Sequence, residues 1–212
     1  RHKIRLNTQI TGIRRHNTGI VARTARGDNE IYDHVIMACH ADQALGLLED
    51  ADAQEQQVLS AFPYSRNSAY LHTDTDLMPG RRKAWSSWNY MGDTQNDSVY
   101  VTYWMNRLQP YLPGSPEIFV TLNPPQPPRQ DSIVYKTAYD HPQFTSAAND
   151  GWANIHSIQG TYNTWFCGAW CGYGFHEDGL SAGLAVAEAL SGIQRPWQIK
   201  DSSPAGHNTI SL

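Results

Sequence analysis

The residues best suited to chemistry lie in a glycine-rich segment close to the C-terminus. Residues 164–168 predict a short strand, residues 168–174 a glycine-rich turn, and residues 180–190 a helix of small and apolar residues. Glycines let a backbone approach a flat ligand, and the free N–H groups at a helix start carry a partial positive charge. The segment therefore suits the anionic edge of a cofactor, although close packing of a helix on a strand also explains it.

Cysteine and histidine side chains in the same region do not predict a metal site. Cys167 and Cys171 are separated by three residues, where zinc sites usually have two, and no second cysteine pair exists. His156 and His176 therefore complete no recognisable ligand set. Together with Cys39, the cysteines are too few and too unevenly placed for a disulfide framework, so a reducing, cytoplasmic setting is expected.

Acid–base pairs elsewhere in the chain have a simple structural explanation. His40 lies close to Asp42, and His72 close to Asp74, but all four occupy predicted strand ends and turns. Ser86 has none of the sequence context that marks a catalytic nucleophile. No catalytic residue is therefore predicted, and hydrolase chemistry is not expected.

The composition is that of a folded, core-forming protein. Of the 212 residues, 40% are hydrophobic and 17% are charged, and the net charge is −4. This acidic balance argues against nucleic-acid binding. No run reaches the roughly 20 apolar residues that a membrane helix needs. The chain opens with Arg1 and lacks an apolar signal core, so we expect it to begin in the middle of a protein.

The remaining pattern predicts two regions. The first 40 residues read as short strands, and residues 35–39 form an apolar run expected of a parallel strand buried on both faces. Helices are expected at residues 42–48 and 51–59. Aromatic and β-branched segments then predict an antiparallel sheet, with strands at residues 67–73, 83–90, 98–105, 117–122 and 132–137.

Several of these segments resemble one protein family. Residues 166–170, 172–180 and 181–187 resemble the C-terminal flavin motif of flavin-containing amine oxidase-like FAD proteins, in particular the bacterial-type predicted NAD/FAD-binding branch. Residues 35–45, 84–90 and 102–109 resemble the same branch. These motifs are long, lie in the family's order and extend over nearly the whole chain.

The resemblance implies an FAD site made of backbone-rich segments. Gly168, Ala169, Gly172, Tyr173 and Gly174 would lie at the pyrophosphate or ribityl part and the flavin face, with Trp170 as a second aromatic wall. Three residues at the helix start would lie under the isoalloxazine ring, and two residues further back would complete the dinucleotide site: Asp178, Gly179 and Leu180, and Ile10 and Ala38. Asp178 is expected to cap the helix first and to neighbour the flavin second.

Two features depart from the family pattern. Ala182 stands where a glycine after serine is usual, which is expected to alter the helix start slightly. The N-terminal Gly-x-Gly-x-x-Gly turn that binds the ADP part of FAD is absent from the chain. We therefore expect this chain to be an incomplete half that needs the missing N-terminal half as a partner and that alone binds FAD weakly or not at all.

The expected architecture is mixed α/β (α+β). Residues 1–50 and 155–200 would form the C-terminal part of an FAD/NAD(P)-binding Rossmann-like domain, residues 60–150 an antiparallel β-sheet substrate domain, and residues 201–212 a tail. The resemblance implies hydride transfer from a small-molecule or lipid-chain substrate to FAD. The alternative is a non-catalytic, β-rich subunit that binds a partner chain.

An aromatic cluster in the predicted sheet has two explanations. Strand alternation buries some of its rings in the core, and the family resemblance makes the same sheet a wall of the substrate cavity. Nearby polar residues would then line the pocket. The aromatic members are Trp85, Trp88, Tyr90, Tyr103 and Trp104, and the polar candidates are Asn89, Asn106 and Arg107.

Overall fold

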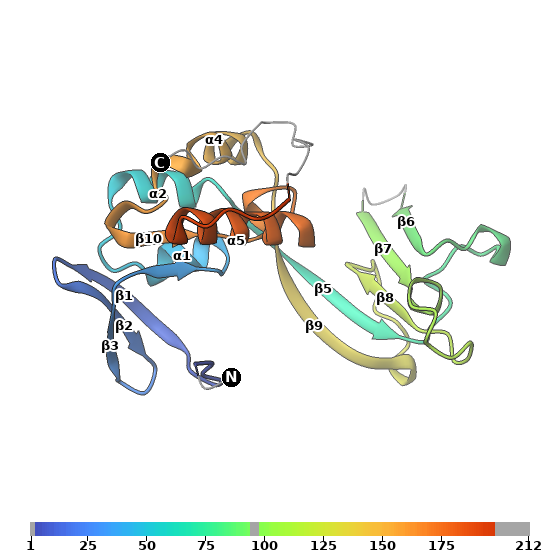
Figure 1. Cartoon of the computed structure of the whole chain (residues 1–212). Helices are drawn as coiled ribbons and strands as arrows, with labels where there is room; N and C mark the ends of the chain where they lie inside the picture. The colour runs from blue at the N-terminus through green and yellow to red at the C-terminus, as the bar shows by residue number, and fades with distance from the viewer. Residues whose placement is uncertain (1–2, 94–97, 198–212) are drawn as a thin grey trace. The chain divides into compact units, whose positions relative to one another are not determined.

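The structure, a computed structural model, describes residues 3–93 and 98–197, and the chain divides into two compact units (Figure 1). The first unit comprises the residues up to Tyr64 and those from Pro142 onward, and the second comprises Ser65–His141. Helices and strands mix in the chain, which confirms the expected α/β (α+β) class. The tail expected at residues 201–212 lies outside the described residues.

The first unit begins with an antiparallel meander of β1 (Ile10–His16), β2 (Gly19–Thr24) and β3 (Asn29–Tyr32). Gly19 has a φ of 134°, a conformation that favours glycine, at the turn between β1 and β2. Alternation buries Ile13 and Ile20 on one face of the meander. The other face carries the polar Arg14, Arg23 and Asn29 together with the apolar Val21 and Ile31.

A parallel pair of strands forms the centre of the first unit. β4 (Val35–Met37) pairs with β10 (Thr164–Phe166), which confirms the expected parallel arrangement. One face packs on α1 (Ala41–Leu47), α2 (Ala53–Ser60) and α4 (Ser146–Asn154) through the core around Met37 and Phe166. On the other face Trp165 and Cys167 pack against Val186 of α5 (His176–Ser191).

Burial of β4 on both faces was expected, and that prediction is wrong for Ile36. Its side chain is 44% exposed, although its neighbour Met37 is buried. Ile36 pairs with Trp165 and so shares the α5 side of the sheet. Among the described residues α5 covers the Trp165 side of that face and leaves Ile36 open.

The ends of the helices show how local hydrogen bonds refine the expected boundaries. α1 and α2 begin close to the expected positions, and Asp52 caps α2 by accepting from the backbone N–H of Glu55 at 2.8 Å. α4 was not predicted, because its sequence combines asparagine, aspartate and glycine without apolar periodicity. Gly151 of α4 lets it approach Phe62, since a Cβ there would lie 2.7 Å from that ring.

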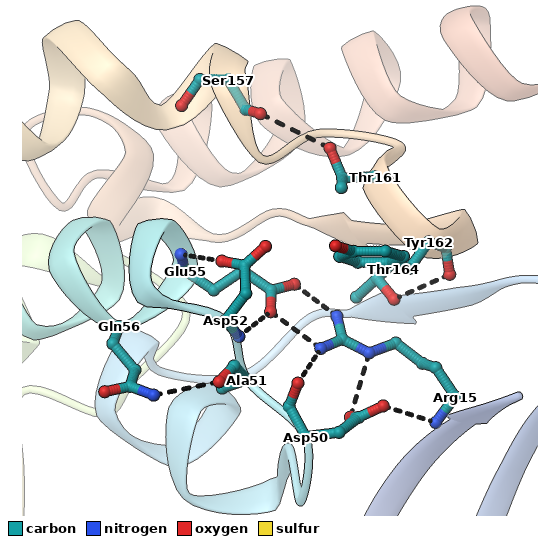
Figure 2. Close-up of polar contacts among 10 residues, drawn as sticks. All are labelled: Arg15, Asp50, Ala51, Asp52, Glu55, Gln56, Ser157, Thr161, Tyr162 and Thr164. Atoms are coloured by element: carbon teal, nitrogen blue, oxygen red, sulfur yellow. Dashed lines mark hydrogen bonds and ion pairs between the residues drawn. The ribbon is translucent and has the colours of Figure 1, made fainter.

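A buried ion pair joins α2 to the meander (Figure 2). The guanidinium of Arg15 on β1 binds the carboxylate of Glu55, with one contact of 2.8 Å, and its Nε lies 3.0 Å from Oδ1 of Asp50. Glu55 is fully buried, and the ring of Tyr162 covers the guanidinium at 5.0 Å. All three nitrogens of the Arg15 guanidinium thus have oxygen partners, and an aromatic ring covers the group, as a buried charge requires.

The second unit is built on a five-stranded sheet in the order β6-β7-β8-β5-β9. Its pairs between β6 and β7, β7 and β8, and β8 and β5 are antiparallel, as expected. The strands are β5 (Tyr64–His72), β6 (Trp88–Asp93), β7 (Ser98–Trp104), β8 (Phe119–Leu122) and β9 (Ile133–Pro142).

Short helices occur in both units of the described chain. They are η1 (Arg82–Ala84), α3 (Met105–Leu108), η2 (Gln130–Ser132), η3 (Ile155–Ser157), η4 (Thr161–Asn163) and η5 (Ala169–Cys171).

The expectation of one strand over residues 83–90 is wrong. A short helix ends at Ala84, and β6 begins only at Trp88. The side chain of Asn89 explains the interruption, because it accepts from the N–H of Ser86 at 2.9 Å and donates to the Ser86 carbonyl at 2.8 Å. These bonds hold a turn that competes with strand pairing.

The two faces of this sheet differ in polarity. One face carries a buried chain of side-chain hydrogen bonds that runs from His72 through Thr121 to Thr102. The register places Trp88 opposite Tyr103 on the other face, where Trp88 is 61% and Tyr90 69% exposed. The second face is therefore apolar and open in the described residues.

Candidate functional site

The glycine turn follows β10 directly and is held against the end of β4. Cys167 donates its N–H to the carbonyl of Met37 at 3.1 Å, and the indole N–H of Trp170 donates to the carbonyl of Cys39 at 3.0 Å. At Gly168 a Cβ would lie 2.7 Å from Nε1 of Trp170, so only glycine leaves room for this ring. Parallel strands end at the same edge, and the turn lies at that edge.

The helix start beside the turn is arranged by Asp178. α5 begins at His176, earlier than the expected residue 180, and its N-cap is Phe175. The carboxylate of Asp178, in the third helical position, accepts from the N–H of Phe175 at 2.8 Å. Asp178 therefore caps the helix, from inside the first turn. The N–H groups of Asp178 and Gly179 donate to the carbonyl of Phe175 at 3.1 and 3.3 Å, which leaves those of His176 and Glu177 without a carbonyl partner within the helix.

Gly172 makes room for this cap. A Cβ at Gly172 would lie 2.3 Å from Oδ1 of Asp178 and 2.6 Å from its Cγ, so any larger residue would displace the carboxylate. Gly174 has a φ of 86°, and a Cβ there would lie 3.2 Å from the ring of Phe144. Gly179 brings α5 close to the turn, since a Cβ at Gly179 would lie 3.5 Å from the backbone N atom of Ala169. Gly172 and Gly174 thus let Asp178 and Phe144 pack closely on the turn.

The structure brings most of the candidate residues together. Those from Gly168 to Leu180 form one strand-end, turn and helix-start unit, and Ala38 lies at the adjoining end of β4. Ile10 lies apart from them in the chain, at the start of β1, where it pairs with Thr24 and packs on the core.

The two aromatic candidates differ in exposure. Trp170 is 3% exposed and packs on Phe62, with 4.8 Å between the ring centroids. Tyr173 is 44% exposed and meets the edge of Trp152 at 5.6 Å. Of these two rings, that of Tyr173 is open to a ligand, while Trp170 supports the turn from within the core.

Two side chains that the sequence analysis did not single out support the backbone at the site. Tyr64 accepts from the N–H of Ala41 at 2.9 Å, and burial raises the pKa of its hydroxyl to about 12. The ring of Tyr64 stacks on His40 with 4.5 Å between the centroids. Trp152 donates to the carbonyl of Trp170 at 2.8 Å. No sequence pattern marks either residue, because their partners are distant in the chain.

The cysteines around the turn are unsuited to nucleophilic or metal chemistry. Burial raises the pKa of the thiols of Cys39, Cys167 and Cys171. A thiol with a raised pKa stays protonated at neutral pH, whereas a nucleophile or ligand must be a thiolate. The described residues also contain no group of three or more His, Cys, Asp or Glu placed to hold a metal ion.

The polar candidates of the second unit are occupied by structural contacts. Asn89 is buried and holds the turn at Ser86, and Asn106 binds the carbonyls of Pro113 and Pro116. Arg107 donates to the carbonyl of Trp85 at 3.2 Å. Their hydrogen-bonding groups therefore maintain loops of the unit.

Hollows in the surface lie away from the glycine turn. One of about 350 Å³ lies on the outer face of the meander and another of about 450 Å³ lies beside Asp74 and Arg129. Both hollows are lined by residues outside the glycine turn, in the described parts of the chain. Within those parts, no helix has the length and apolar character needed to cross a membrane.

Comparison with known proteins identifies the fold. No family model and no curated protein matches the sequence. Solved structures do match: a CLA-producing fatty acid isomerase from P. acnes (TM-score 0.55, 16% identity), a protein assigned as a protoporphyrinogen oxidase from Exiguobacterium sp. 255-15 (0.55, 14%) and a reduced UDP-galactopyranose mutase (0.60, 11%). The chain shares their fold. The fold expected from the sequence resemblance is thereby confirmed, and at these identities the likeness shows the fold alone.

The matches cover most of this chain but less than half of each neighbour. They take in 82%, 88% and 88% of this chain, and 45%, 47% and 47% of the respective neighbours. The chain thus spans about half the length of the solved structures it resembles.

Proposed function

We propose that this chain is the C-terminal half of an FAD-dependent oxidoreductase of the amine oxidase-like type. The observation that carries the proposal is the glycine turn between β10 and α5, which lies at the end of the parallel strands β4 and β10. In open α/β sheets, ligands bind outside the carboxyl ends of the strands. The fold is shared with an isomerase, a protein assigned as an oxidase and a mutase, and this supports the proposal that the chain is part of an enzyme.

The residues present fit a flavin. Gly174 is exposed, Ala169 and Gly172 are partly exposed, and the ring of Tyr173 is open beside them. The N–H groups of His176 and Glu177 lie at the start of α5, and the partial positive charge there favours an anionic pyrimidine edge. When bound, FAD would supply the hydride acceptor. The chain's own residues would hold and orient the ring and tune its charge.

We further propose that the site is completed by a second half, which supplies the dinucleotide turn. β4 and β10 form a sheet of only two parallel strands in the described residues, and parallel sheets normally have both faces covered. The α5 side leaves Ile36 open, and Leu180 is 55% and Leu190 38% exposed on the helix itself. Further strands and a helix beside α5 would cover this surface.

The open face of the second unit fits an apolar substrate. Trp88 and Tyr90 on β6 and Val99 on β7 are exposed there, and the ring of Tyr103 lies 6.3 Å from that of Trp88. No charged side chain belongs to the paired positions of this face in β6, β7 and β8. A lipid chain is therefore the class we favour, and one fold neighbour is a fatty acid isomerase. We expect a reducing, cytoplasmic setting, which suits three free cysteines.

A visible absorption spectrum tests the flavin proposal. The purified chain is mixed with FAD, and bound flavin is read from shifted bands at about 370 and 450 nm. The measurement is repeated after co-expression with the preceding segment of its own reading frame. The proposal expects bound flavin in the assembled protein, and Gly172→Ala to weaken it, since the new methyl group displaces Asp178.

The matched control is Gly46→Ala in α1, where a Cβ meets no atom within 4 Å. It should leave flavin binding unchanged. An assembled protein that stays colourless with FAD would overturn the proposal and favour the non-catalytic role of a partner-binding subunit.

A further inference from the structure

The outer face of the meander gathers positive charge. The register pairs Gly12 with Arg23 and Arg14 with Val21, so these four residues share one face. Ile13 points to the opposite face, where it is buried in the core. The two arginines lie on adjacent strands, with side chains 56% and 50% exposed.

A single carboxylate orients both arginines. Glu49 follows α1 and is fixed through its backbone, which donates to the carbonyl of Ile13 at 2.9 Å. Its side chain lies 3.1 Å from Nε of Arg14 and 2.9 Å from Nη2 of Arg23. Gly12 makes this possible, because a Cβ there would lie 2.3 Å from Oε1 of Glu49. The guanidinium groups are thus aimed at one place rather than spread over solvent.

Charge and hydrogen-bonding capacity remain unused in this arrangement. A guanidinium carries five N–H donors, and Glu49 engages one nitrogen of Arg14 and one of Arg23. In the parts of the chain that the structure describes, no other acceptor contacts these two side chains. Two positive charges thus face one negative charge around a hollow of about 350 Å³, which His16 and Asn29 also line.

We propose that this hollow binds a compact oxyanion, either a phosphate group or a carboxylate. The two guanidiniums present N–H pairs in the fork geometry that matches such anions, and Asn29 adds an amide donor at the rim. The volume accommodates a phosphate or pyrophosphate group. The site lies on the meander, on elements other than the glycine turn and α5, and the proposal does not depend on flavin binding.

Calorimetric titration of the full chain with inorganic pyrophosphate, inorganic phosphate and acetate tests the site. Saturable binding is expected, and Arg23→Gln should weaken it at least about tenfold, as expected for losing a charge-assisted contact. The matched control is Arg26→Gln, which removes the same charge from an exposed residue outside the lining and should change the affinity little. Tight binding of pyrophosphate with weak binding of acetate identifies a phosphate site, and the reverse identifies a carboxylate site.

Two results would overturn the proposal. One is the absence of saturable binding for all three anions. The other is equal weakening by Arg23→Gln and Arg26→Gln, which would mean that only net charge matters. Circular dichroism checks that the variants fold, and Arg14→Gln replaces Arg23→Gln if the latter does not, with the same expected loss.

Discussion

At the scale of single residues, Arg15 and Glu55 carry the sharpest expectation for stability. Their ion pair is buried, and Asp50 is the second carboxylate on the guanidinium (Figure 2). Glu55→Gln removes one charge and leaves Arg15 poorly compensated in a buried place. We expect the free energy of unfolding to fall by about 3 kcal/mol, measured by urea denaturation.

The control for this substitution is Glu30→Gln, which removes a carboxylate from the exposed pair with Arg5. Water screens such a pair, so a much smaller loss is expected. Equal losses for the two variants would show that the burial of Arg15 and Glu55 does not set the strength of their pair.

The protonation state of His72 is also fixed by its neighbours, because both ring nitrogens have hydrogen-bond partners. The N–H of Asp74 donates to Nδ1 at 3.1 Å, so Nε2 carries the proton and donates to Thr121 at 2.7 Å. Thr121 then passes a hydrogen bond to Thr102, which donates to the carbonyl of Leu77 at 3.1 Å. Burial lowers the pKa of His72, and a second proton on Nδ1 would face the N–H of Asp74.

This chain of bonds makes stability depend on pH. The unfolded state takes up a proton on His72 near its ordinary pKa of about 6.5, and the folded state does so only at lower pH. The free energy of unfolding should therefore fall as pH drops from about 7 to 5, by up to about 1.4 kcal/mol per pH unit. Denaturation at several pH values measures it.

Two variants separate this effect from others. His72→Gln should flatten the profile between pH 7 and 5. Asp74→Asn should not flatten that slope, because the charge of Asp74 raises the pKa of His72 against the larger effect of burial. Burial opposes ionisation of Asp74 itself, but hydrogen bonds from the backbone of Arg129 and Asp76 outweigh it and lower the pKa of Asp74. The stabilising effect of the ionised Asp74 carboxylate in the unsubstituted protein is lost only as pH falls below about 4. An unchanged slope in His72→Gln would rule out His72 as its source.

At the scale of the elements, the start of α5 depends on one glycine and one carboxylate. Asp178→Ala removes the bond to the Phe175 N–H and should lower the free energy of unfolding by about 1 kcal/mol. Gly172→Ala should cost more, since its methyl group displaces the carboxylate and crowds the turn. Gly183→Ala should instead stabilise by about 0.5 kcal/mol, because the methyl group meets no atom within 4 Å. A loss in Gly183→Ala would contradict this account.

The same elements show what the sequence could predict. The apolar run at residues 35–39 and the glycine-rich segment were enough to place a parallel strand, a turn and the following helix. The turn at Asn89 was hidden, because it depends on side-chain bonds to Ser86 rather than on glycine or proline. The start of α5 was placed late, because His176 and Glu177 carry no apolar signal.

The candidate site was predictable only in part. Glycine spacing marked the segment from Gly168 to Gly174, since close approaches of backbone need glycine. The support from Tyr64 and Trp152 follows from contacts between distant parts of the chain, which a single sequence does not encode locally. Burial of Trp170 was missed for the same reason: its partners, Phe62 and the carbonyl of Cys39, belong to other elements.

At the scale of the whole molecule, the described residues form one unit from two separate stretches of sequence and a second unit from the stretch between them, each with buried residues of its own. Phe166 is fully buried among helices and the parallel strands of the first unit, and Phe119 is fully buried in the sheet of the second. Each core is built from residues of its own unit. The stability of one unit should therefore respond to its own core first.

Phe166→Ala and Phe119→Ala test this division as a matched pair. Each removes an equally buried ring and should cost about 3–5 kcal/mol where it acts. Hydrogen exchange read by mass spectrometry resolves the two units: Phe166→Ala should speed exchange in α1, α2 and β10, and Phe119→Ala in β7 and β8. If either variant accelerates exchange equally throughout residues 3–93 and 98–197, the two cores unfold as one cooperative body, and the division into two units has no energetic meaning.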